Sequence, residues 1–169
     1  MPVPGRVFDH AGLSVADLEA MRDWYAEALG MTVEFGFELP GGLMRGAMLH
    51  APAPDGGEGF RLELLHRSDS ATGLQAANPL EAAATRGFGH LAFDVPDVDS
   101  AYAALLALGA TDRMSPRPSP EPGVRMAYVA DPEGNLLELL DRAAAKAAGR
   151  YGRGEAHHLD DLNDLGDPS

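Results

Sequence analysis

Two histidines and two glutamates occupy equivalent settings in this sequence. Glu63 and Glu138 each lie inside an apolar run, GFRLELLHR and DPEGNLLELLD, where a strand with a buried face would not be expected to carry an acid. His10 and His90 precede these runs at similar distances along the chain. Two imidazoles and two carboxylates together suit a divalent ion such as Zn²⁺, Ni²⁺, Co²⁺, Mn²⁺ or Fe²⁺. Any one of the four alone would be ordinary, but their matched positions predict a metal site with one such ion.

The histidines open an internal repeat. The segments HAGLSVADLEAMRDWYAEALG and HLAFDVPDVDSAYAALLALG both place Val five residues and Asp seven residues after the His, and both end in Leu-Gly. His-x-x-x-x-Val is typical of a short strand. Asp17 and Asp97 are placed to cap a following helix, and Gly30 and Gly109 to end it. Each copy therefore begins as a strand followed by a helix.

Three more strands are expected after each helix, so that each copy is a βαβββ module. The expected strands are Thr32–Phe37, Leu43–His50 and Phe60–Leu65 in the first copy, and Thr111–Met114, Val124–Ala130 and Leu136–Leu140 in the second. The predicted organisation is a first module at 6–67, a linker at 68–86, a second module at 87–142 and a C-terminal tail at 143–169 that starts helical and becomes acidic. The predicted fold class is α+β, with the two modules pairing into a curved half-barrel sheet around the metal.

Alternation along the last strand of each module explains its acid. Leu62 and Leu64 fall on one face of the first of these strands, whereas Arg61 and Glu63 fall on the other. If the first and last strands of a module are neighbours, its histidine and glutamate nearly meet. Two modules related by a pseudo-twofold axis then bring all four ligands to one point.

The amino-acid composition limits the kinds of molecule that this protein is expected to bind. The net charge is −13, so the surface repels polyanions, and no basic face for nucleic acid is visible. No apolar run approaches the length of a membrane span, and the start of the chain has no apolar segment typical of a secretion signal. The absence of cysteine excludes disulfides and thiolate sites. We expect a cytoplasmic protein with a small-molecule substrate and neither nucleic-acid nor membrane partners.

These motifs resemble the vicinal oxygen chelate superfamily, which includes glyoxalase I, methylmalonyl-CoA epimerase, extradiol dioxygenases, and fosfomycin and bleomycin resistance proteins. The resemblance is carried by HAGLSVADLEAMRDWYAEALGM, GFGHLAFDVPDVDSAYAALLALGA and YVADPEGNLLELL. It implies paired βαβββ modules and metal ligands at His10, Glu63, His90 and Glu138. Glutamate at the second ligand position is similar to the glyoxalase I and epimerase branch.

That branch implies a metal-dependent lyase or isomerase that acts through a metal-stabilised enediolate. Glu63 and Glu138 would then be the catalytic base and acid. The resemblance to bacterial glyoxalase I is incomplete at two positions. That enzyme has the pattern His-x-x-x-Arg on its first strand, whereas this chain has Ser14 in place of the arginine. It also has an asparagine after its second ligand, where this chain has Arg67. A small oxoacid, a thioester or a thiol adduct is therefore expected as substrate instead of a glutathione adduct.

Two alternatives remain open. An Fe²⁺ extradiol ring-cleaving dioxygenase would use His10, His90 and Glu138, but Glu63 would then close a position that dioxygen and catechol need. A drug-binding resistance protein without catalysis would ordinarily lack the four ligands. The candidates for a substrate pocket are Arg61, Arg125 and Tyr128, the last by similarity to a pocket tyrosine of the dioxygenases.

Oligomeric state also follows from the resemblance. Modules in this superfamily pair within one chain or across two chains. A homodimer is therefore expected, and His10 with Glu63 can meet either their own chain's second pair or that of another subunit.

Overall fold

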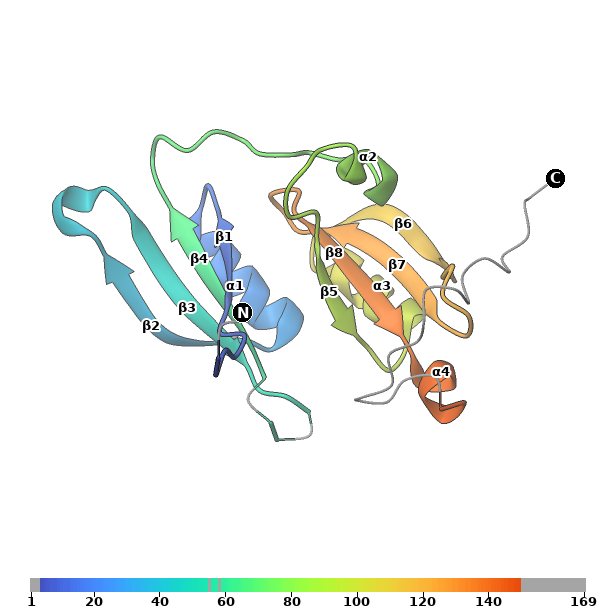
Figure 1. The fold of residues 1–169 in the computed structure, drawn as a ribbon. Helices are drawn as coiled ribbons and strands as arrows, with labels where there is room; N and C mark the ends of the chain where they lie inside the picture. The colour runs from blue at the N-terminus through green and yellow to red at the C-terminus, as the bar shows by residue number, and fades with distance from the viewer. Residues whose placement is uncertain (1–3, 55, 58, 150–169) are drawn as a thin grey trace.

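Each copy of the repeat forms one four-stranded sheet with a helix packed against it (Figure 1). The structure is a computed structural model that describes residues 4–54, 56–57 and 59–149. The first module consists of β1 (Ala11–Ser14), α1 (Leu18–Leu29), β2 (Thr32–Glu38), β3 (Arg45–Ala51) and β4 (Phe60–His66). The second module consists of β5 (Leu91–Asp94), α3 (Val98–Ala107), β6 (Thr111–Pro118), β7 (Arg125–Ala130) and β8 (Leu136–Asp141). Shorter helical segments are η1 (Pro40–Gly42), α2 (Pro79–Ala83) and α4 (Ala143–Ala147).

The two sheets have the same topology. Their strand orders are β1-β4-β3-β2 and β5-β8-β7-β6. In each sheet the first strand pairs in parallel with the last strand, and the remaining pairs are antiparallel. The predicted α+β class and paired βαβββ modules are confirmed, with two separate sheets that do not close into a barrel.

Both helices begin at the aspartate residues that were predicted to cap them. The Asp17 side chain accepts a hydrogen bond from the backbone N–H of Ala20, and the Asp97 side chain accepts one from that of Ser100, both at 2.9 Å. Gly30 follows α1 at φ 63°, a left-handed conformation that only glycine adopts without strain. Each helix therefore begins at its aspartate cap, and α1 ends at its glycine.

Two strands differ from their predicted bounds by more than one residue. β3 begins at Arg45 instead of Leu43, because η1 and the residues after it form the turn. β6 was expected to end at Met114 but continues to Pro118. It is the edge strand of its sheet, and its pairing with β7 shifts register between Met114 and Arg117. Proline is tolerated at such a site because no partner strand needs its missing N–H.

One hydrophobic core joins the two modules. Leu62 and Leu64 of β4 are fully buried in it, as are Leu137 and Leu139 of β8. Residues of both helices belong to the same core. The inner face of each sheet, which carries these leucines, therefore packs into a shared interior that also holds α1 and α3 (Figure 1).

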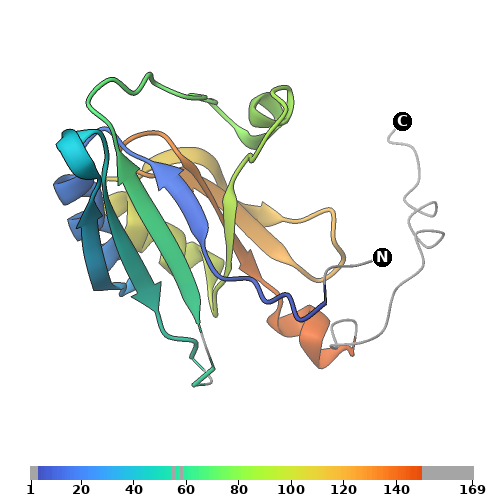
Figure 2. The same ribbon diagram turned by 60° about the vertical axis from the view of Figure 1, so that its left-hand side comes forward.

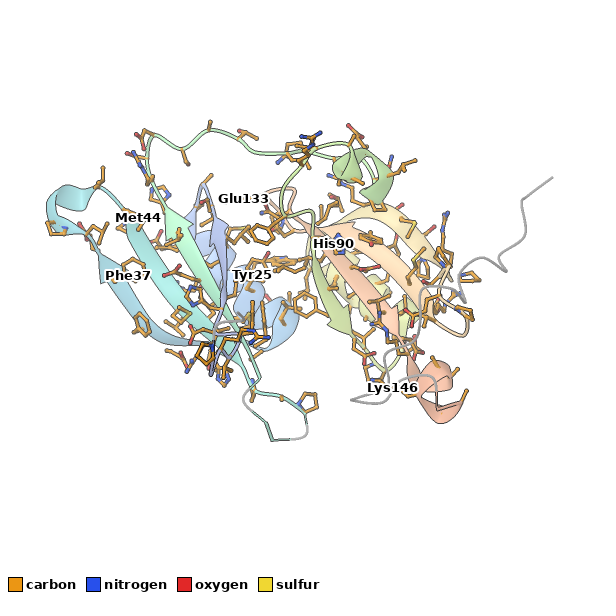
Figure 3. The ribbon with its side chains drawn as sticks, in the orientation of Figure 1. Tyr25, Phe37, Met44, His90, Glu133 and Lys146 are labelled. Atoms are coloured by element: carbon orange, nitrogen blue, oxygen red, sulfur yellow. The ribbon has the colours of Figure 1, made fainter. Side chains whose placement is uncertain are left out.

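Polar contacts fix the modules against each other. The carboxylate of Glu133, in the turn before β8, accepts hydrogen bonds from the backbone N–H groups of Ala16 at 2.7 Å and Asp17 at 2.9 Å. The Trp24 indole N–H donates to the carbonyl of Leu108 at 2.8 Å. Figure 3 shows Tyr25 and Glu133 at this junction. The relative placement of the two sheets is thus specified by contacts between the modules.

The outer face of the second sheet, opposite the core, is covered at both ends. Leu136 packs against Ala76 and Ala82, and α2 contributes the second of these alanines. At the other end, α4 packs Ala145 against Leu140, and Lys146 of α4 pairs with Asp94 (Figures 1 and 3). The middle of this outer face lies between the two helices.

The linker and the described part of the C-terminal tail each contain one short helix. The chain between β4 and β5 runs over one end of both modules and contains α2 (Figure 2). The helical start predicted for the tail corresponds to α4, and the acidic remainder from residue 150 lies outside the described residues. Within the described part of the chain, no helix has the length and apolar character needed to cross a membrane.

Candidate metal centre

His10 and Glu63 meet on the outer face of the first sheet. β1 and β4 are parallel neighbours, and Gly12 lies opposite Glu63. His10 precedes Gly12 by two residues and shares its face. The Nε2 atom of His10 lies 3.5 Å from Oε2 of Glu63. The first module thus holds one imidazole and one carboxylate side by side.

His90 and Glu138 form the same arrangement on the second sheet. Ala92 of β5 lies opposite Glu138 of β8. The Nε2 atom of His90 lies 3.0 Å from Oε2 of Glu138. Figure 3 shows His90 at the start of β5. The sequence repeat is therefore also a structural repeat, down to the nitrogen and the oxygen that approach each other.

One chain does not bring the two pairs together. Glu63 alternates with the core leucines of β4 and Glu138 with those of β8, so both glutamates lie on outer faces. Among the residues that the structure describes, no three histidine, aspartate or glutamate side chains are grouped as a metal site. Each pair presents one nitrogen and one oxygen that converge, which fits half of a four-ligand site for a divalent ion.

Asp9 supports the first histidine. Its Oδ1 atom lies 2.6 Å from Nδ1 of His10. This hydrogen bond is the main cause that raises the pKa of His10 and lowers the pKa of Asp9. A carboxylate on Nδ1 holds the proton there and leaves Nε2, the atom that faces Glu63, as the one to bind a metal. Sequence reasoning missed Asp9, although a carboxylate next to a predicted histidine ligand was a usable signal.

Tyr128 supports the second glutamate. It lies opposite Glu138 across β7 and β8, and its ring packs edge-on against His90 with centroids 5.3 Å apart. Its pKa is raised, first by burial and then by the hydrogen bond to Glu138 and the charge of that carboxylate. Tyr128 therefore keeps its hydroxyl proton, which makes it a potential hydrogen-bond donor beside Glu138. Tyr128, predicted as a residue of the substrate pocket, thus contacts the candidate ligand His90.

The two predicted pocket arginines are both engaged in ion pairs. Arg61 is on the same face as Glu63, and its Nε atom lies 3.0 Å from Oε2 of Glu34. Arg125 is bound to Asp99 by two hydrogen bonds of 2.6 and 2.7 Å at the start of α3. Because Arg125 and Tyr128 lie an odd number of residues apart on β7, they point to opposite faces. Arg125 is thus placed on the helix side of its sheet.

A cavity of about 440 Å³ lies between β1 and β5. Both His10 and His90 border it, together with Phe8 and Phe88, which stand two residues before them. Both phenylalanines are exposed. The edges of the two sheets nearest the candidate ligands therefore carry apolar side chains that this chain alone does not cover.

Comparison with known proteins gives the same fold. The family model of the Glyoxalase/Bleomycin resistance protein/Dioxygenase superfamily matches residues 7–139. No curated protein matches the chain. Similar solved structures include a point mutant of glyoxalase I from Zea mays, at 24% identity and a TM-score of 0.62. That match covers 79% of this chain and 44% of the Zea mays chain, so this chain spans less than half of that protein.

Two further structures match over nearly their whole length. Trypanothione-dependent glyoxalase I from Leishmania major is 23% identical with a TM-score of 0.62, and the match covers 86% of this chain and 94% of that one. A glyoxalase family protein from Enterococcus faecalis is 23% identical with a TM-score of 0.64, covering 81% and 98%. At these identities the likeness establishes a common fold. With the family model matching most of its length, this chain belongs to the Glyoxalase/Bleomycin resistance protein/Dioxygenase superfamily.

Proposed function

We propose that this protein is a metal-dependent lyase or isomerase of the glyoxalase and epimerase kind, acting on a small oxoacid, thioester or thiol adduct. The observation that carries the proposal is the pair of equivalent His–Glu arrangements, His10 with Glu63 and His90 with Glu138. Fold similarity to glyoxalase I of Zea mays and Leishmania major supports the same class of activity. Two carboxylates in one site are also what a proton-transfer reaction needs, since one can take a proton while the other stays charged.

The complete site would form between two copies of the chain. His10 and Glu63 of one copy would join His90 and Glu138 of the partner subunit. Each pair lies on the outer face of its sheet, and within the described part of one chain the two pairs are not grouped as a metal site. The exposed phenylalanines beside both histidines support burial against a second copy. Phe35 on β2 is a further exposed apolar side chain, on the first module.

The chemistry would be divided between the ion and the carboxylates. A divalent ion held by two imidazoles and two carboxylates supplies Lewis-acid stabilisation of negative charge on neighbouring substrate oxygens. Glu63 and Glu138 provide carboxylate oxygens that take a proton from carbon and return it to a neighbouring position. Arg61, in its ion pair with Glu34 on the same face as Glu63, is the arginine placed to help position an anionic substrate.

Two double variants test both the activity and the shared site. One chain carries His10→Ala and Glu63→Ala, and the other carries His90→Ala and Glu138→Ala. Each alone lacks half of every site. If sites form across two chains, a mixed dimer of the variants has one intact site, whereas sites within a chain would all be damaged. The mixed dimer is purified through two different tags, loaded with Co²⁺ and assayed for bound metal and turnover.

The substrate panel consists of hemithioacetals from 2-oxoaldehydes and simple thiols, 2-methyl-branched acyl thioesters and small 2-oxoacids. We expect wild-type protein to bind one Co²⁺ per chain and to turn over at least one class. The mixed dimer should recover half of the metal and about half of the turnover. Failure of the wild-type chain to bind metal would overturn the proposal, and dioxygen uptake with catechols by the iron-loaded protein would favour the dioxygenase instead.

A further inference from the structure

We propose that the contact between the modules couples the two metal sites of a dimer, so that binding of one ion favours binding of the second. The residue that provides the coupling is Glu133, which holds the first His–Glu pair of a chain in a fixed position relative to the second pair. This inference rests on the proposed function, because it needs sites that are shared between two copies of the chain. Glu133 is a positioning residue in this scheme and not a metal ligand.

The Glu133 carboxylate joins the second module to the start of α1. Its Oε2 atom accepts a hydrogen bond from the backbone N–H of Ala16 at 2.7 Å, and its Oε1 atom accepts one from that of Asp17 at 2.9 Å. Both N–H groups lie at the N-terminal end of the helix, where the helix dipole favours a negative charge. Each carboxylate oxygen has its own donor, so the two bonds, called here the Glu133 clamp, restrict rotation between the modules.

The turn that carries Glu133 is itself held in place. Asp131 is buried and accepts hydrogen bonds from the backbone N–H of Glu133 at 2.9 Å and from the hydroxyl of Tyr25 at 2.8 Å. On the linker side, the Gln75 side chain donates to the carbonyl oxygen of Glu133 at 3.0 Å. A Cβ atom at Gly134 would lie 2.2 Å from Oε1 of Gln75, so the linker lies directly against the turn. The first module, the linker and the start of β8 are thus joined at Glu133 (Figure 3).

The clamp depends on a residue that differs between the two copies of the repeat. Ala16 lies six residues after His10, and Pro96 lies six residues after His90. Proline has no backbone N–H, so the start of α3 cannot offer the same two donors. The fixed connection between the modules is therefore asymmetric, although the modules match around their His–Glu pairs.

The clamp connects the two strands that carry the candidate ligands. Ala16 follows β1, which begins directly after His10, and Glu133 precedes β8, which carries Glu138. A displacement of one module against the other would therefore move one His–Glu pair relative to the other pair of the same chain. With the clamp in place, each chain presents its two pairs as one rigid unit.

Two rigid chains cannot complete their shared sites independently of each other. Binding of the first ion requires the first pair of one copy and the second pair of the partner subunit to come together. Because both chains are rigid, the remaining two pairs are then held in a set orientation. The second ion meets these ligands at a high effective concentration, and the modules do not have to be ordered again. The expected result is positive cooperativity between the two sites.

Cobalt titration tests the coupling without any substrate. Free Co²⁺ is set with a chelator buffer at low protein concentration, and bound cobalt is measured by equilibrium dialysis. The wild-type protein should show a Hill coefficient of about 1.5 or more, the upper limit being the number of coupled sites. Glu133→Ala should bind as much cobalt as the wild-type protein but with a Hill coefficient of about 1, because the clamp is lost.

Two further variants make the comparison specific to the clamp. Glu81→Ala is the matched control, because the Glu81 carboxylate also accepts a backbone N–H, from Ala77 at 3.0 Å, but does so within the linker. It should keep the wild-type Hill coefficient. Ala16→Pro copies the residue of the second module and removes one of the two donors to Glu133. Its Hill coefficient should lie between those of the wild-type protein and Glu133→Ala, and it provides the test should Glu133→Ala fail to fold.

A distance measurement checks the rigidity itself. The chain has no cysteine, so Glu38→Cys on β2 and Ser115→Cys on β6 place one spin label on the edge strand of each sheet. Double electron–electron resonance, with the labelled chain diluted in unlabelled protein, should give a narrow distribution of distances. Adding Glu133→Ala should broaden it.

The outcomes separate this inference from the proposed function. A distribution that stays narrow in Glu133→Ala would overturn the clamp, and cooperative binding that persists with a broadened distribution would overturn the coupling. A wild-type Hill coefficient of about 1 would overturn the inference and leave the proposed function intact. A wild-type protein that binds no cobalt would overturn both.

Discussion

The hydroxyl of Tyr25, on α1 of the first module, donates a 2.8 Å hydrogen bond to Oδ2 of Asp131 in the second module. Both residues are almost fully buried. Asp131 also accepts hydrogen bonds from the backbone N–H groups of Glu133 and Asn135 and thereby shapes the turn before β8. That turn places Glu133 against the start of α1, so this contact links the helix of one module to the last strand of the other.

Tyr25→Phe is expected to lower the free energy of unfolding by about 1 to 2 kcal/mol, because it leaves a buried carboxylate with one donor fewer. Tyr102 of α3 is the control, because it is a helix tyrosine of the second module that is only partly buried and lies near the exposed Asp112. Tyr102→Phe should cost less than half as much. Urea denaturation of both variants measures the difference, and equal losses would contradict the role given to the Tyr25–Asp131 contact.

Gly46→Ala is expected to destabilise the first sheet by about 1 to 3 kcal/mol, because there is no space for a methyl group. A Cβ atom there would lie 2.4 Å from Cζ of Phe37 and 3.0 Å from the carbonyl oxygen of Leu64. Gly36 is the control on the neighbouring strand, where the nearest atom would be 3.5 Å away. Gly36→Ala should change stability by less than about 1 kcal/mol. A thermal unfolding series would contradict this account if the two variants behaved alike.

The ligand pairs could be predicted from the sequence because they depend on local rules. Period-two alternation puts Glu63 and Glu138 on the face opposite their leucines, and the repeat places a histidine on the adjoining strand. The same alternation along β7 would have placed Arg125 on the face away from Tyr128. The sequence reasoning considered the charge of Arg125 and not its face, which is why the pocket prediction grouped the two residues.

The relation between the pairs was not predictable in the same way. Whether His10 meets His90 of its own chain depends on how the inner faces pack, and contacts such as the edge-on pair Phe60–Phe93 decide this. These residues lie far apart in the sequence and obey no short period. The extension of β6 through Pro116 was missed for a related reason. A strand can contain proline when it lies at the edge of its sheet, and the strand order that puts β6 at the edge is a property of the whole sheet.

Acid should weaken the contact between Asp99 and Arg125. The hydrogen bond from Arg125 is the main cause that lowers the pKa of Asp99 below its ordinary value. A carboxylate with a depressed pKa in the folded state adds stability above its unfolded pKa, and this contribution is lost as pH falls through the folded pKa. Asp99→Asn should therefore lower Tm at pH 7, and its effect should shrink as pH falls through the lowered pKa of Asp99. Glu27→Gln, which removes the same charge from α1, is the control, and an Asp99→Asn effect independent of pH would contradict the assignment.

Asp9→Asn should weaken metal binding by about tenfold, since the amide no longer holds a proton firmly on Nδ1 of His10. Asp9 is exposed, so the variant should unfold at nearly the same temperature as the wild-type protein without metal. Asp69→Asn changes the same charge in the linker, beside Arg67, and should leave metal affinity unaltered. Cobalt titration and calorimetry on the three proteins provide both readouts. A large fall in the apo Tm with unchanged cobalt affinity would assign Asp9 a structural role instead.

Metal removal should separate the subunits if each ion is bound by two chains. Under the proposed arrangement, each ion is bound by His10 and Glu63 of one copy and by the second His–Glu pair, from the partner subunit. The free energy of metal binding therefore adds to the stability of the dimer. Sedimentation velocity should show a dimer with Co²⁺ and a shift toward monomer at low protein concentration after chelation. His10→Ala should show that shift even when cobalt is present, whereas His50→Ala, a change of the same kind on β3, should remain dimeric. A monomer that binds one ion tightly would contradict the shared site, because it would require both pairs to meet within a single chain.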